Sequence, residues 1–146
     1  MKTYQPKRKE IERSWHLLDA KDQILGRLST KVAELLMGKG KASFSTHMDS
    51  GDFVVVLNGE KIKVSGNKSS QKLYRSHSGY PGGYKEVKFE RMMEKAPQRI
   101  LEHAVSGMLP DNRLKSPRMA RLRVVIGEAN PFAKKFEVKV KKAETK

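Results

Sequence analysis

The sequence predicts an α/β fold of three layers, in which helices cover both faces of a mostly parallel sheet of roughly four strands. The β-branched run at residues 52–58 (DFVVVLN) is typical of a central strand buried on both faces. Residues 25–36 place apolar side chains at the spacing of one helix face. Helical and strand-like segments then alternate along the chain of 146 residues, which is long enough for one domain with a real core.

The first segment, residues 1–13, carries five cations and two acids and lacks the apolar content to pack alone. It is either an arm that contacts nucleic acid or a frayed terminus. Residues 14–19 (SWHLLD) predict a buried strand, in which we expect His16 to be structural. The helix that follows ends at Gly38, which suits a left-handed C-cap.

The next two segments are polar. Residues 38–41 (GKGK) follow a helix and lack the GxxxxGK[ST] spacing, so we expect a basic loop against a phosphate backbone rather than a nucleotide site. In residues 47–52 (HMDSGD), one histidine and two carboxylates are compatible with a metal or with acid–base chemistry. Asp-Ser-Gly-Asp before a strand is nevertheless typical of a turn, and the turn is the stronger prediction.

After the central strand and a turn at Asn58-Gly59, alternation at residues 61–65 predicts a shorter, half-exposed strand. The basic stretch, residues 61–85, holds six cations, no acid, three tyrosines, His77 and four glycines. Cations neutralise phosphates, aromatic rings stack on exposed bases, and glycine permits close backbone approach. The stretch therefore indicates nucleic-acid contact, and the alternative is a solvated loop.

The C-terminal half begins with a brief extended piece at residues 87–89 and a short helix. A second helix starts at Pro97, and its apolar stripe predicts core packing. Residues 112–123 carry five cations and no acid, which indicates a second anion-binding face or a solvated helix and loop. A late strand ends at Gly127. We therefore divide the chain into an arm (1–13), one α/β domain (14–127) and a Lys-rich extension (128–146).

The net charge of +15 favours a polyanionic partner, with nucleic acid first and an acidic membrane surface second. The longest apolar run, residues 53–57, is far below the ~20 residues of a spanning helix, so we expect no membrane partner. The chain has no cysteine, which excludes disulfides and thiolate metal sites and suits a reducing cytosol. No apolar run follows the basic start, so a secretory signal is not expected.

Catalytic motifs are absent from the sequence. The four histidines stand at positions 16, 47, 77 and 103 without metal-ligand spacing, and neither GxSxG nor GxGxxG occurs. We therefore expect no enzyme, no cofactor, no metal and no small-molecule substrate. A small nucleotide-using α/β enzyme is the weaker alternative.

Several stretches together resemble the bacterial form of the universal large-subunit ribosomal protein thirteen. They occur in the order and spacing of that family over roughly residues 14–127. The matching pieces are Trp15 with Leu18-Asp19-Ala20, Leu25-Gly26-Arg27-Leu28, Gly38-Lys39 with Lys41, His47 with Asp49 and Gly51-Asp52, Val54–Asn58, Gly66-Asn67-Lys68, Lys72 with Tyr74, His77-Ser78-Gly79-Tyr80-Pro81-Gly82-Gly83, and Ala104-Val105 with Gly107-Met108-Leu109-Pro110.

The resemblance implies an α/β/α structural protein of the large ribosomal subunit that binds large-subunit rRNA, enters early in assembly and resides in the cytoplasm. Neighbouring large-subunit proteins are implied partners, and no catalytic activity or cofactor is implied. The remaining alternative is a regulatory RNA-binding protein that acts off the ribosome. Three positions depart from the family pattern: Thr46 replaces a proline, residues 115–118 (KSPR) replace Leu-Gly-Arg, and Asn130-Pro131-Phe132 with a Lys-rich end replaces the usual C-terminal motif.

We expect the RNA contacts to come from the basic stretch, the loop after the first helix and the second basic segment. In particular, Tyr74, His77 and Tyr80 are expected to stack on or hydrogen-bond to bases and riboses. The full set of predicted RNA-binding residues is Lys39, Lys41, His47, Lys61, Lys63, Lys68, Lys72, Tyr74, Arg75, His77, Gly79, Tyr80, Gly82, Gly83, Lys85, Arg113, Lys115, Arg118 and Arg121.

Overall fold

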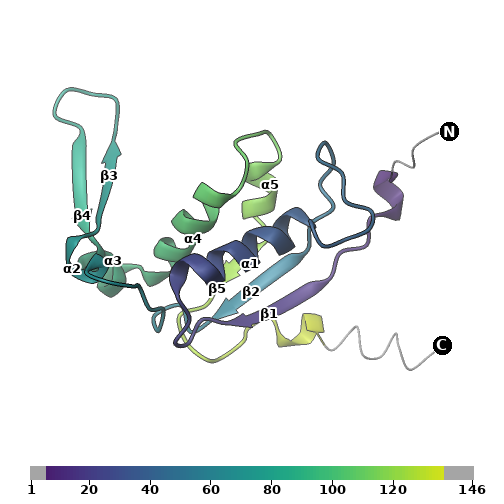
Figure 1. Cartoon of the computed structure of the whole chain (residues 1–146), viewed down its shortest axis with the longest axis horizontal. Coiled ribbons are helices and arrows are strands. Elements are labelled where there is room, and N and C mark those ends of the chain that lie inside the picture. The colour runs from purple at the N-terminus through teal and green to yellow at the C-terminus, as the bar shows by residue number, and fades with distance from the viewer. Residues whose placement is uncertain (1–5, 137–146) are drawn as a thin grey trace.

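A computed structural model describes residues 6–136 of the chain (Figure 1). Its centre is a parallel sheet of three strands in the order β1-β2-β5, with Leu17 opposite Val55 and Val55 opposite Arg123. The sheet and its helices have these bounds: β1 Trp15–Asp19, α1 Leu25–Met37, β2 Phe53–Leu57, α4 Pro97–Met108, α5 Lys115–Met119 and β5 Leu122–Val124. The α/β class and the mostly parallel sheet are thereby confirmed.

The four strands and the three layers that the sequence predicted are not confirmed. Residues 61–65 form no strand, and their one bridge in the described part of the chain pairs Lys63 with Ile24. Both long helices lie on the same face of the sheet, since α1, α4, Val54 and Val56 share one buried cluster. The alternation of apolar residues at 61–65 therefore did not indicate a strand. The segment packs on the core through Ile62 without joining the sheet.

The core forms where the predicted helix stripe meets the central strand. Leu28, Val32 and Leu36 of α1 are fully buried, and Val54 and Val56 face them from β2. At the end of α1, Gly38 adopts a left-handed conformation (φ 75°) and its N–H donates to the carbonyls of Glu34 and Leu35. The predicted C-cap is confirmed, and so is the helix beginning at Pro97. The strand predicted at 14–19 is confirmed as β1, but it is half-buried to exposed rather than buried.

The opposite face of the sheet carries an aromatic cluster. Trp15 stacks on Phe53 with ring centroids 4.4 Å apart, and Phe132 and Phe136 approach Trp15 to 6.1 and 6.0 Å. The segment after β5 therefore returns to the sheet and packs on Trp15 of β1. Of the predicted arm and extension, residues 1–5 and 137–146 lie outside the described residues.

The basic stretch forms a β-hairpin that projects from the body (Figure 1). Strand β3 (Leu73–His77) pairs antiparallel with β4 (Tyr84–Lys88). Two short helices, α2 (Lys68–Gln71) and α3 (Phe89–Lys95), lie at its base. The predicted short helix before Pro97 is confirmed as α3, but for the hairpin itself the sequence predicted only a loop and a brief extended piece. These strands are mostly polar and are held together by their cross-strand backbone hydrogen bonds. They therefore lack the apolar alternation that marks a strand with one buried face.

Candidate nucleic-acid interface

The hairpin presents two faces of different character. On one face, Arg75 is paired with Glu86 and His77 with Tyr84. On the other face, Tyr74 is paired with Val87 and Ser76 with Lys85, because side chains alternate along each strand. The first face points cations and rings to solvent, whereas the second begins with Tyr74 packed on the body of the protein.

The tip of the hairpin, residues 78–83, holds Tyr80 away from the body. Its side chain is 76% exposed. The Gly83 N–H donates to the Tyr80 carbonyl at 2.9 Å, and the Ser78 N–H donates to the Gly83 carbonyl at 3.2 Å. Gly79 and Gly82 have φ values of 87° and 73°, which favour glycine. These bonds and turns order the backbone, so Tyr80 is a preorganised flat surface suited to stacking on an unpaired base.

His77 stands beside the tip with its ring exposed. Its Nδ1 lies 2.9 Å from the Gly79 nitrogen and accepts that backbone N–H. In the neutral imidazole the proton then resides on Nε2, which is left as a donor. His77 can therefore donate to a phosphate oxygen or to an acceptor on a base edge.

Tyr74 has a different environment from the exposed stacking ring that the sequence predicted. Its ring packs between Phe89 (6.5 Å) and the edge of His103 (5.4 Å), and the Lys72 Nζ lies 5.3 Å from the ring centre. The hydroxyl is buried and has no hydrogen-bond partner among the described residues. Burial raises the pKa of Tyr74, so the group stays a neutral phenol. Tyr74 anchors the hairpin to the body.

The cations of the basic stretch are mostly exposed. Lys68, Arg75 and Lys85 face solvent, with the Arg75 Nε 4.0 Å from Glu86. Lys61 and Lys63 pair with Glu128 (3.1 Å) and Asp22 (2.6 Å). Exposed pairs of this kind contribute little stability, so a phosphate can replace the carboxylate.

In the loop after α1, Lys39 and His47 are exposed, but Lys41 is directed inward. The Lys41 Nζ donates to the Asp52 carboxylate at 2.6 Å and to the carbonyls of Ser50 and Glu12 at 3.0 and 2.8 Å. Three protein acceptors satisfy the three N–H groups of this ammonium. In this arrangement Lys41 ties the loop to the N-terminal segment and has no free donor for a phosphate.

Asp52 is the centre of a small polar cluster. Besides Lys41, its carboxylate accepts the Ser14 N–H at 2.7 Å and lies 2.9 Å from the His16 Nε2. Burial by itself raises the pKa of Asp52, but the hydrogen bonds from Lys41, Ser14 and His16 outweigh it and hold the pKa below its ordinary value. His16 thus has the structural contact that the sequence analysis expected.

Arg118 and Arg121, both predicted to bind RNA, are buried against Asp49 instead. Arg121 donates two hydrogen bonds to the Asp49 carboxylate, one of them at 2.6 Å, and a third to the Leu36 carbonyl at 3.1 Å. The Arg118 side chain is only 2% exposed, and its Nε lies 3.7 Å from Asp49. Burial raises the pKa of Asp49, but Arg121, Arg13 and Arg118 together lower it below its ordinary value.

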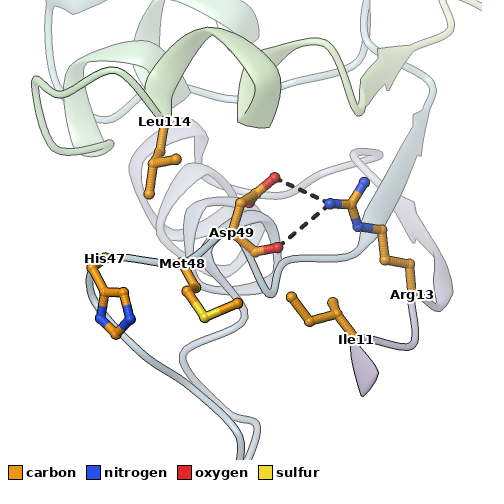
Figure 2. A pocket seen from close by; sticks show the side chains of 6 residues that line it. All are labelled: Ile11, Arg13, His47, Met48, Asp49 and Leu114. Atoms are coloured by element: carbon orange, nitrogen blue, oxygen red, sulfur yellow. Dashed lines mark hydrogen bonds and ion pairs between the residues drawn. The ribbon is translucent and has the colours of Figure 1, made fainter. Parts of the chain in front are cut away.

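Asp49 also lines a surface pocket of about 600 Å³ (Figure 2). In Figure 2, Arg13 points toward Asp49, and their closest atoms are 3.4 Å apart. The His47 ring lies on the other side of the pocket. In the segment from 47 to 52, Asp49 pairs with the buried Arg118 and Arg121, and Asp52 pairs with the half-buried Lys41, in agreement with a structural turn.

The second basic segment is divided between surface and interior. Arg113 is exposed, and Lys115 pairs with the exposed Asp111 at 2.7 Å. With Arg118 and Arg121 buried, this segment offers a weaker anion-binding face than its five cations suggested. Two exposed cations that the sequence analysis did not single out are Lys88 and Arg99. Lys88 borders the basic stretch, and Arg99 lies off the apolar stripe of α4. These two features of the sequence could have identified both residues as exposed cations.

Within residues 6–136, no three side chains of His, Cys, Asp or Glu converge to hold a metal ion. None of the helices in this part of the chain combines the length and the apolar character that crossing a membrane requires.

Residues 13–131 match the family described as Ribosomal protein L13. The large ribosomal subunit protein uL13 of Prochlorococcus marinus (strain MIT 9312) is 54% identical over 132 residues, which cover 90% of this chain and 92% of that protein. The protein of the same name from Clostridioides difficile (strain 630) is 51% identical over 133 residues, or 91% of this chain and 93% of the relative.

Proposed function

The chain belongs to the ribosomal protein L13 family, and from that premise we propose that it binds large-subunit rRNA through its projecting hairpin and supports early subunit assembly. It is a structural protein of the large ribosomal subunit rather than an enzyme, and its place is the cytoplasmic ribosome. Neighbouring large-subunit proteins are its further proposed partners.

The observation that carries the proposal is the projecting hairpin. It combines exposed cations, an ordered tip and the exposed Tyr80 ring on one protrusion. A protrusion of this kind can enter folded RNA, where cations neutralise phosphates and a ring stacks on an unpaired base. The net charge of +15 adds long-range attraction to the polyanion.

Filter binding with transcribed large-subunit rRNA tests the electrostatic part. If six to ten phosphates are neutralised, affinity falls about 10³–10⁵-fold between 50 and 200 mM salt. An affinity that does not change with salt would refute this account.

The Tyr80→Ala variant tests the tip. Loss of a stacked base costs ~1–3 kcal/mol, which corresponds to a decrease in affinity of about 5–150-fold. Tyr80→Phe is the matched control, because it keeps the ring and removes only the hydroxyl, and we expect affinity within about twofold of the parent. Unchanged binding by Tyr80→Ala would exclude the stacking role.

Sedimentation of cell extract through a sucrose gradient tests the assembly role. We expect the protein to migrate with the large subunit and its precursors. Recovery only in fractions free of ribosomal particles would instead support a regulatory RNA-binding protein.

A further inference from the structure

A groove of about 510 Å³ runs between the hairpin and helix α4, and the proposed stacking at the tip does not use it. The inner face of the hairpin forms one wall with Tyr74, Ser76 and Val87, and α4 forms the other with His103 and Ser106. The hairpin is thus the outer wall of an open slot as well as a protrusion.

The interior of the groove has an apolar surface with polar edges. Val87, Met92 and Met119 contribute apolar side chains from three different elements. Thioether side chains adapt to flat, polarisable groups and make favourable contacts with aromatic rings. The surface therefore suits a planar heterocycle better than a charged or strongly hydrated group.

The charge at the groove indicates what such a heterocycle is attached to. Arg99 of α4 lines the groove, against the single carboxylate of Glu102, whereas the Arg75 side chain lies on the opposite face of the hairpin beside Glu86. Lys85 lies on the same hairpin face as Ser76 and adds a cation nearby. Arginine recognises phosphate oxygens through paired donors, so this balance favours a polyanionic strand.

We propose that this groove binds one unstacked nucleotide of the rRNA. The base lies against Val87, Met92 and Met119, and the flanking phosphates meet Lys85 and Arg99. Glu102 supplies an acceptor for a base amino group or a ribose 2′-hydroxyl. The proposal rests on the proposed rRNA-binding function and adds a second contact that is continuous with the hairpin tip.

The absence of cysteine in the chain allows a site-specific probe. We would replace the half-buried Ser106 with cysteine and measure its alkylation by a bulky maleimide, with and without transcribed large-subunit rRNA. Leu17→Cys is the matched control, because Leu17 is 47% exposed and lies on the sheet face away from α4. We expect rRNA to slow alkylation at position 106 at least tenfold and to leave position 17 within about twofold. Prior alkylation at position 106 should reduce rRNA affinity by a similar factor.

A second variant tests the phosphate contact. Arg99→Gln should reduce the slope of log affinity against log salt by about 1. Arg27→Gln removes an exposed arginine of α1 and is the control, for which we expect an unchanged slope. Urea unfolding of each variant shows whether a loss of binding reflects a loss of folding.

Full rRNA affinity after alkylation of position 106, together with an alkylation rate that rRNA does not slow, would overturn the groove site. This combination of results would leave the hairpin function intact. Protection of position 106 only in assembled subunits, and not by naked rRNA, would also overturn it, since the occupant would then be a protein segment. If the parent chain fails to bind rRNA at all, the proposed function itself is refuted.

Discussion

The buried ion pair between Asp49 and Arg121 gives the sharpest test of how this fold is stabilised. Asp49→Asn keeps the size of the side chain and one acceptor oxygen but removes the negative charge. Arg121 and Arg118, with side chains 5% and 2% exposed, would then remain as buried cations without their common carboxylate.

The expected cost follows from the geometry. Breaking a buried ion pair by removing one partner typically costs ~3–5 kcal/mol. The lower end applies here, because Arg121 keeps its bonds to the carbonyls of Leu36 (3.1 Å) and Asp52 (3.3 Å). We therefore expect the free energy of unfolding to fall by about 3 kcal/mol at pH 7. With a urea dependence of about 2 kcal/mol per M, the midpoint would fall by about 1.5 M.

Urea unfolding followed by the fluorescence of the single tryptophan, Trp15, measures this change, because that ring stacks on Phe53 in the folded state. Asp111→Asn is the matched control: its pair with Lys115 is similar in length, but the Asp111 side chain is 92% exposed. We expect it to cost less than about 0.5 kcal/mol. A loss below 1 kcal/mol for Asp49→Asn, indistinguishable from that control, would refute the reasoning.

Three further predictions concern the same folded state. The pKa values of Asp49 and Asp52 lie below the ordinary value, so their contribution to stability is complete above about pH 4 and is lost as the pH falls through the lowered values. Equilibrium unfolding between pH 7 and pH 2 should show this decline in the free energy of unfolding. A free energy of unfolding that rises on acidification would contradict it. Gly51→Ala should destabilise the fold by more than 3 kcal/mol or prevent folding, because a Cβ there would lie 1.7 Å from the Leu36 carbonyl oxygen. A 2 °C change in melting temperature corresponds to roughly 0.5 kcal/mol, so a melting temperature within 2 °C of the parent would exclude that clash. Tyr74→Phe removes a buried hydroxyl without a partner and should raise the free energy of unfolding by about 1 kcal/mol, whereas a loss of stability in urea would indicate a hydrogen bond at that hydroxyl.

The strongest local patterns predicted their elements correctly. The β-branched run became the central strand β2, and the apolar stripe with Gly38 became α1 with its left-handed cap. Both patterns depend on side chains that must leave water, and burial is encoded in the order of residues along one segment. The hairpin was missed because strands β3 and β4 are polar on most positions and are held by pairing with each other.

For the interface, the residue types of the basic stretch indicated a cationic surface, and the hairpin does place Arg75, His77 and Tyr80 in solvent. The sequence could not show that Tyr74 packs on Phe89 and His103, since His103 lies 29 positions further along the chain. The groove between the hairpin and α4 likewise exists only once these two elements stand side by side.

The sequence by itself determined the charge of this protein, its family, its central strand and its first helix. Each of these follows from composition or from the order of neighbouring residues. Only the tertiary structure decided which cations are available to RNA. Arg121 and Asp49 are separated by 72 positions in the chain, and folding brings them into contact. A cation that meets a carboxylate in the interior is satisfied there, whereas an identical residue on the hairpin remains free for a phosphate, and no local pattern distinguishes the two.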